Sequence, residues 1–157
     1  LVSHGVLFRG GQEESIRKNL VSEGLLDAVI GLPDRLLLGT GIPCAILIFR
    51  RDKKHSNVVF IDASDLAKPV KGRNLITNEI IEKVSECYFE RSSISNFSYV
   101  ASFDEIQEND FNLNISRYVK KHEEQAFVDL ESLRQQREEL LSTLHELERE
   151  MKDFIDN

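Results

Sequence analysis

The sequence predicts an α/β domain followed by a long helix, and three observations support this fold class. Short apolar runs bounded by charged or turn-forming residues recur along the first half of the chain, which is typical of buried strands. Stretches with helical apolar spacing lie among them. The C-terminal segment carries an uninterrupted heptad repeat instead. These patterns favour a sheet with covering helices over residues 1–119 and an assembly helix over residues 120–157.

Composition favours a globular protein and argues against a broad DNA-wrapping charge. Of the 157 residues, 41% are hydrophobic and 30% are charged. No apolar run reaches the roughly 20 residues of a membrane span. The formal net charge is −7, and residues 120–157 hold 6 Lys/Arg against 11 Asp/Glu, so the tail is not expected to touch phosphates. The chain starts without Met inside an apolar segment, and we therefore expect a fragment of a longer protein.

Cysteine and histidine usage points to neither a disulfide framework nor a metal site. Cys44 and Cys87 are too few for a four-cysteine zinc site, and both lie in apolar patterns. We expect two buried free thiols and a reducing, cytoplasmic location. The four histidines show no metal-ligand spacing.

The first elements are a strand end and a helix. Val6–Phe8 is interpreted as the tail of a strand that begins outside the chain. Gln12–Val21 is predicted to be a helix with an apolar edge at Ile16 and Leu20. Gly24 is expected to end this segment.

Three apolar runs predict the central strands. They are Leu25–Leu32, Cys44–Phe49 and Val58–Asp62, and the second is apolar enough to be covered on both faces. The Gly- and Pro-containing link between the first two runs is too short for a crossover helix. These two strands are therefore predicted to be antiparallel neighbours.

The rest of the domain is predicted to be mostly helix and loop. Residues 68–75 are interpreted as a loop, and Lys53, Lys54 and Arg73 as solvated charges. Asn78–Phe89 is predicted to be a helix whose apolar face holds Ile80, Ile81, Val84 and Tyr88. Ser102 and Glu105 have capping-box spacing. Residues 109–119 show no clear period and are expected to pack across the domain surface.

The heptad positions of the last segment predict a helix that needs a partner. These positions are Ala126, Leu130, Leu133, Arg137, Leu140, Leu144, Leu147, Met151 and Phe154. A helix of roughly 30 residues would be about 45 Å long, and leaving its stripe in water forfeits on the order of 10 kcal/mol. We expect Leu130, Leu133, Arg137, Leu140, Leu144, Leu147 and Met151 to contact another chain or a second copy. The alternative is a helix that folds back on its own domain. Arg137 either selects the partner or extends its charge to the surface.

Five motifs occur together in a specific order. They are "HGVLFRGG", "IRKNLVSEGLLDAVIGLP", "GTGIPCAILIFRR", "VVFIDAS" and "NDFNLNISRYV". Over residues 4–119 the chain resembles the methyltransferase (modification) subunits of type I restriction-modification systems. The resemblance implies the C-terminal part of an S-adenosylmethionine-dependent methyltransferase sheet, mostly parallel with one antiparallel strand near its edge. It also implies methyl transfer to the exocyclic amine of adenine in DNA, in a complex with a specificity subunit and a restriction subunit.

Two motifs of that family are missing from the sequence. Neither the catalytic Asn-Pro-Pro-Phe motif nor the Gly-containing donor motif is present. We therefore assign no catalytic, cofactor-binding or metal-binding residue. S-adenosylmethionine is expected only in the full-length enzyme, and the 157 residues alone are expected to be inactive.

The resemblance places one loop at the active-site edge, where it helps to hold the flipped adenine. In this loop, residues 32–43, the polar candidates for base or backbone contact are Asp34, Arg35 and Thr40. Ordinary loop roles remain open for each. Leu37 stands where relatives often carry an aromatic residue suited to base stacking, so stacking at this position is in doubt.

Two other functions are compatible with the same patterns. The chain could be a non-catalytic α/β interaction module that forms a homodimer through its C-terminal helix. Alternatively, it is one half of a split gene whose other half supplies the missing motifs. The modified DNA site is not encoded here, because the resemblance assigns its recognition to the specificity subunit.

Overall fold

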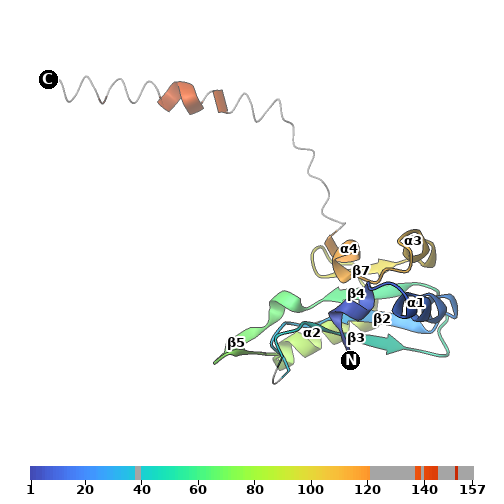
Figure 1. Cartoon of the computed structure of the whole chain (residues 1–157). Coiled ribbons are helices and arrows are strands. Elements are labelled where there is room, and N and C mark those ends of the chain that lie inside the picture. Colours follow the sequence, from blue (N-terminus) through green and yellow to red (C-terminus); the bar gives the residue numbers. More distant parts are fainter. Residues whose placement is uncertain (38–39, 121–136, 139, 145–150, 152–157) are drawn as a thin grey trace. The chain divides into compact units, whose positions relative to one another are not determined.

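The computed structural model describes residues 1–37, 40–120, 137–138, 140–144 and 151 of the chain (Figure 1). The chain divides into two compact units, Leu1–Glu123 and Glu124–Asn157. Every strand that the structure describes lies in the first unit. Among the described residues, no helix is long and apolar enough to cross a membrane.

A five-stranded mixed sheet forms the centre of the first unit. Its order is β1 (Val2–Ser3), β3 (Cys44–Phe49), β2 (Leu26–Gly31), β4 (Val58–Asp62) and β7 (Ser98–Ala101). β2 and β4 are parallel, whereas β3 is antiparallel to both β1 and β2. The predicted antiparallel pairing across the short link is confirmed. The sheet also has a second antiparallel strand, β7 beside β4, which the sequence did not predict.

Helices cover both faces of this sheet, which explains why β2 is buried along its whole length. On one face, Val29 and Phe60 belong to a core that includes residues of α1 (Gln12–Ser22), α3 (Phe103–Glu108) and α4 (Ile115–Val119). On the other face, Ile30 and Ile61 belong to a core that includes Cys87 of α2 (Asn78–Glu90). Adjacent strand residues thus serve opposite layers, as the period of two requires.

Residues 109–119 pack across the domain and close it, as predicted. Their apolar side chains are buried, whereas Asp110, Ser116 and Arg117 are exposed. The Tyr118 ring stacks on Phe60 with 3.9 Å between centroids, and Tyr118 is fully buried. Its hydroxyl donates to the Asn112 carbonyl oxygen at 2.6 Å. Burial raises the pKa of Tyr118, which keeps this hydroxyl protonated as a donor. The segment lacks an apolar period because Asp110 and Phe111 have φ angles of 55° and 53°, which turn the chain between buried positions.

The N-terminal strand assignment is also wrong. Residues His4–Leu7 form a 3₁₀ helix, η1, and the strand ends earlier, at Ser3. The Gly5 carbonyl oxygen accepts from the backbone N–H groups of Phe8 and Arg9 at 3.2 and 3.0 Å, which closes this turn. Extended backbone over Val6–Phe8 cannot form these bonds.

The two long helices have the predicted positions but not all of the predicted faces. Ile16 is 57% exposed and Ile81 is 52% exposed, although both were expected on apolar faces. α1 instead buries Arg17, which donates to the carbonyl oxygens of Phe111 and Val6 at 3.1 and 2.8 Å. Burial lowers the pKa of this guanidinium, although nearby Glu14 and Glu13 oppose that shift.

Residues 68–75 form a β-hairpin, which corrects their prediction as a loop. The hairpin pairs β5 (Lys68–Val70) with β6 (Arg73–Leu75). Its two turn residues, Lys71 and Gly72, have φ angles of 38° and 87°. Positive φ at both central residues is the type I′ turn that suits the twist of a two-stranded ribbon.

Smaller predictions are confirmed. The Glu105 backbone N–H donates to Ser102 Oγ at 3.2 Å, which is the capping bond expected at the start of α3. Gly24 follows α1 with a φ of 66°. Cys44 and Cys87 are buried free thiols. The described residues contain no group of three or more His, Cys, Asp and Glu that could hold a metal ion, and the absence of a metal site stays a prediction.

The described tail residues are helical but do not test the long helix. Arg137, Glu138, residues 140–144 and Met151 have helical backbone. Leu130, Leu133 and Leu147 lie outside the described residues, so one continuous helix stays a prediction. In the second unit, Leu140, Leu144 and Met151 are 71%, 50% and 64% exposed.

Candidate functional site

The strands place two loops at one edge of the sheet, which we call the carboxyl edge. β1, β2 and β4 run in the same direction, and Gly31 pairs with Asp62 where β2 and β4 end. Among the described residues, the carboxyl edge comprises residues 32–37 and 40–43 after β2 and residues 63–66 after β4. In open α/β sheets, ligands bind outside the carboxyl ends of the parallel strands. This edge is therefore the candidate site.

The loop after β2 is held by the β5–β6 hairpin. Asn74 Nδ2 donates to the Asp34 carbonyl oxygen at 2.9 Å and to Asp34 Oδ1 at 2.8 Å. The Asn74 backbone N–H donates to the Arg35 carbonyl oxygen at 3.0 Å. Asp34 is thereby engaged in holding the loop against the hairpin. Sequence reasoning missed Asn74, whose signal was the two-residue Lys-Gly turn in "VKGR".

Arg35 and Leu37 are exposed, as is Asp34, but only the Asp34 side chain is hydrogen-bonded to the hairpin. Arg35 has a φ of 49°, and its guanidinium is 67% exposed, with only a 3.7 Å ion pair to Asp34. Leu37 is 40% exposed. Thr40 Oγ1 accepts from the Ile42 backbone N–H at 3.1 Å, a local turn bond. The loop thus presents one cationic side chain and the apolar side chains of Leu37 and Ile42, while Asp34 and Thr40 shape its backbone.

The strand ends themselves are tightly packed. A Cβ on Gly31 would lie 2.8 Å from Ile115 Cδ1, so any larger residue between β2 and α4 would force the end of the Ile115 side chain to shift. The Ala63 backbone N–H donates to the Gly31 carbonyl oxygen at 3.0 Å, which joins the two strand ends. Asp62 Oδ1 accepts from the Ser64 backbone N–H and hydroxyl at 3.1 and 2.5 Å. These contacts fix the base from which both loops leave the sheet.

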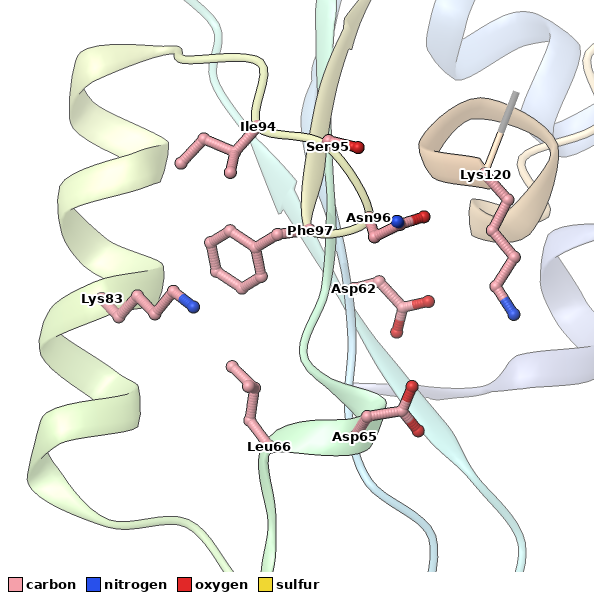
Figure 2. Close-up of a pocket in the computed structure, with 9 residues that line it drawn as sticks. All are labelled: Asp62, Asp65, Leu66, Lys83, Ile94, Ser95, Asn96, Phe97 and Lys120. Atoms are coloured by element: carbon pink, nitrogen blue, oxygen red, sulfur yellow. The ribbon is translucent and has the colours of Figure 1, made fainter. Parts of the chain in front are cut away.

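A pocket of about 460 Å³ opens beside the end of β4. Its lining residues are Asp62, Asp65, Leu66, Lys83, Ile94, Ser95, Asn96, Phe97 and Lys120. Figure 2 shows the Asp62 and Asp65 carboxylates on the side of Lys120, and Phe97 and Leu66 toward the helix that carries Lys83. Lys83 Nζ lies 4.3 Å from the Phe97 ring centroid, a cation–π contact. The walls carry charges of both signs and do not converge on one ligand type.

A second polar cluster lies at the opposite edge, which we call the amino edge. Asp27, at the start of β2, is fully buried and accepts from Tyr88 Oη at 2.6 Å and from Arg91 Nη1 at 3.0 Å. Arg91 Nη2 donates to the carbonyl oxygen and Oδ1 of Asn57, both at 3.0 Å. Lys53 Nζ donates to the Leu26 carbonyl oxygen at 2.5 Å.

The charges of this cluster are balanced against burial. Burial would raise the pKa of Asp27, but the Tyr88 hydrogen bond and the Arg91 charge outweigh it and keep that pKa below its ordinary value. Burial and the Arg91 charge lower the pKa of His55. The hydrogen bonds of Asp27, Tyr88 and Arg91 hold α2 and the turn before β4 against β2, which is a structural role.

Comparison with known proteins identifies the family. The N-6 DNA methylase family model matches residues 1–127. The chain belongs to the N-6 DNA methylase family. It is 38% identical to the type I restriction enzyme MjaVIII methylase subunit of Methanocaldococcus jannaschii, over 83% of this chain and 24% of that protein. The family resemblance inferred from the five motifs is confirmed.

Two further relatives give the same picture. The chain is 32% identical to the type I restriction enzyme MpnII methylase subunit of Mycoplasma pneumoniae, over 96% of this chain and 28% of that protein. This chain is also 47% identical in sequence to the type I restriction-modification system methyltransferase subunit from Streptococcus thermophilus, and it matches the crystal structure of that subunit with a TM-score of 0.73. That match covers 74% of this chain and 25% of the other. The chain thus spans about a quarter of the length of these relatives.

The described residues do not fit the methyl donor that the family implies. S-adenosylmethionine needs a glycine-lined cradle after a strand. At the carboxyl edge, the glycine that ends β2 is Gly31, and Ile115 fills the space above it. No donor site is therefore assigned within the described part of the chain.

Proposed function

We propose that this chain is part of the modification subunit of a type I restriction-modification system. The whole subunit transfers a methyl group from S-adenosylmethionine to the exocyclic amine of adenine in DNA, in the cytoplasm. The observation that carries the proposal is the match of the family to residues 1–127, together with an open loop at the carboxyl edge. The donor pocket and the Asn-Pro-Pro-Phe motif belong to the rest of the whole protein.

The contribution of this chain is one wall of the site that receives the flipped adenine. Its exposed Leu37 contributes apolar contact, and the exposed Arg35 guanidinium pairs with the DNA backbone. Asp34 and Thr40 keep the loop in shape through their bonds to Asn74 and Ile42. Positioning of the base relative to the donor is what this wall adds to the reaction.

A comparison of the full-length subunit with this chain alone tests the proposal. The full-length subunit is assembled with its specificity subunit and supplied with radiolabelled S-adenosylmethionine and unmethylated DNA. We expect label in adenine for this complex. The 157-residue chain alone is expected neither to transfer label nor to bind the donor in calorimetry. Turnover by the short chain, or no adenine methylation by the complex, would contradict the proposal.

The C-terminal segment is proposed to assemble the complex with the specificity and restriction subunits. Leu140, Leu144 and Met151 are spaced to share a helix face and are exposed in the described residues. The alternative function, a homodimeric interaction module, uses the same face. Light scattering with and without the specificity subunit separates the two. Leu144→Glu should abolish the association. The matched control Ser142→Glu lies in the same helical segment but outside the heptad positions, and it should preserve the association.

A further inference from the structure

We propose that the β5–β6 hairpin binds DNA phosphates beside the target adenine, with Lys71 and Arg73 as its contacts. This inference rests on the proposed function and extends it to a surface outside the predicted loop. The hairpin begins soon after the carboxyl end of β4, and its residues Lys68–Val70 and Arg73–Leu75 are exposed apart from Asn74. Figure 1 shows β5 extending away from the sheet.

The local charge of the hairpin is opposite to that of the chain. The formal net charge is −7, yet residues 66–78 contain Lys68, Lys71 and Arg73 and no Asp or Glu. Within the described part of the chain, none of these three cations forms an ion pair. Unpaired cations in an acidic protein provide a local site for polyanions, and phosphate contacts supply much of the affinity of DNA-binding proteins.

The turn residue at the tip supports a functional role. Lys71 has a φ of 38° in a turn where Asn, Asp or Gly is preferred. A lysine in this conformation is unfavourable relative to those residues. The gain from placing a lysine there is an ammonium group at the end of the ribbon, where a DNA backbone can approach without contacting the sheet.

The hairpin is also fixed relative to the predicted base-binding loop. A free two-stranded ribbon is marginally stable in water. Asn74 joins this one to the loop through its side chain, on Asp34, and its backbone N–H, on Arg35. The cations of the hairpin and the exposed Arg35 therefore belong to one connected surface. When the target adenine enters at the loop, the phosphates that flank it lie within reach of the hairpin. The bonds of Asn74 hold the hairpin in that position.

The test removes two charges from the hairpin and two from the opposite edge. The variant is Lys71→Gln/Arg73→Gln. The matched control is Arg51→Gln/Lys54→Gln, which removes one lysine and one arginine from exposed positions in the turn at the amino edge. Both are made in the full-length subunit assembled with its specificity subunit. DNA affinity is measured at several salt concentrations, together with affinity for S-adenosylmethionine.

For the hairpin variant we expect DNA binding to weaken about tenfold, equally on cognate and non-cognate duplexes, because each lost phosphate contact costs about threefold. The slope of log Kd against log salt should fall by about 1.8. The control should match the wild type, and donor affinity should stay unchanged in both. Equal DNA affinity and salt slope in the variant and the control would overturn the hairpin proposal. Weakened association with the specificity subunit at an unchanged salt slope would assign the hairpin to a protein contact and also overturn it. Failure of the wild-type complex to methylate DNA would instead contradict the proposed function.

Discussion

The two edges of the same sheet use charged side chains in opposite ways. At the amino edge, Asp27 is fully buried and its oxygens are taken by Tyr88 and Arg91. At the carboxyl edge, Arg35 is exposed with one weak ion pair, and Lys71 and Arg73 of the hairpin bonded to that edge have none among the described residues. This difference indicates that the amino edge contributes stability, whereas the carboxyl edge is available to a ligand. Four substitutions test whether the two edges have these different roles.

The largest loss of stability is expected when Asp27 loses its closest cation. Arg91→Met keeps an apolar stem but leaves a buried carboxylate without that partner, which costs about 3–5 kcal/mol. The control is Arg50→Met, which removes a guanidinium that is 56% exposed and 3.9 Å from the same carboxylate. That loss should be below about 1 kcal/mol. Urea unfolding measures both, and equal losses would show that burial does not distinguish the two pairs.

Tyr88→Phe should produce a smaller loss that depends on pH. It removes a hydrogen bond to a buried carboxylate, worth about 1.5–3 kcal/mol at neutral pH. The pKa of Asp27 is lowered in the folded state, so its contribution is present above about pH 4 and is lost as pH falls through the folded-state pKa. The variant raises that pKa, and its acid-unfolding midpoint should move to higher pH. Tyr99→Phe, which loses a bond to the partly exposed Glu105, is the control and should leave the midpoint in place.

Gly31→Ala tests the packing below the carboxyl edge. The added methyl group would lie 2.8 Å from Ile115 Cδ1, and such overpacking costs about 1–3 kcal/mol. Ile115→Val removes the clashing carbon, so the double variant should recover part of this loss in thermal unfolding. Gly10→Ala, whose nearest contact would be 3.6 Å away, should be nearly neutral. Strict additivity of Gly31→Ala and Ile115→Val would contradict the proposed clash.

Asn74→Ala should have the smallest effect on stability, about 1 kcal/mol, because its partners at the carboxyl edge can turn to water. Its effect on DNA binding should be larger than this small loss of stability suggests. With the side-chain bonds to Asp34 lost and only the backbone bond to Arg35 left, the hairpin is held less firmly, and DNA affinity of the full complex should fall several-fold. The control is Asn19→Ala, at an exposed position of α1, and its DNA affinity is measured by the same titration. An unchanged DNA affinity would show that the loop and the hairpin act independently.

Where buried surface sets the pattern, the sequence predicts the fold well. β2, β3 and β4 were predicted within a residue or two because near-continuous apolar runs serve both faces of the sheet. Three of the five family motifs contain these strands. The hairpin was missed because almost none of it is buried, so no apolar alternation marks its strands. The local structure of residues 109–119 was not predicted, because positive φ angles at Asp110 and Phe111 interrupt any helical or strand period.

The candidate site was only partly predictable for a related reason. Asp34, Arg35, Leu37 and Thr40 lie together on one loop, as chain proximity requires. What each does depends on partners far away in sequence: Asn74 is 40 residues from Asp34. The same holds at the amino edge, where Tyr88 and Arg91 are 61 and 64 residues from Asp27. Spacing along one chain carries no information about such pairs.

Photocrosslinking from each edge shows whether DNA approaches the carboxyl edge, as proposed, or the amino edge. A benzoylphenylalanine is introduced at Leu37 or at Lys54 in the full-length subunit, which is assembled with its specificity subunit and bound to labelled duplex containing the target adenine. The account predicts crosslinks to DNA from position 37 and none from position 54. Crosslinks from position 54 alone, in a complex that still methylates adenine, would contradict it.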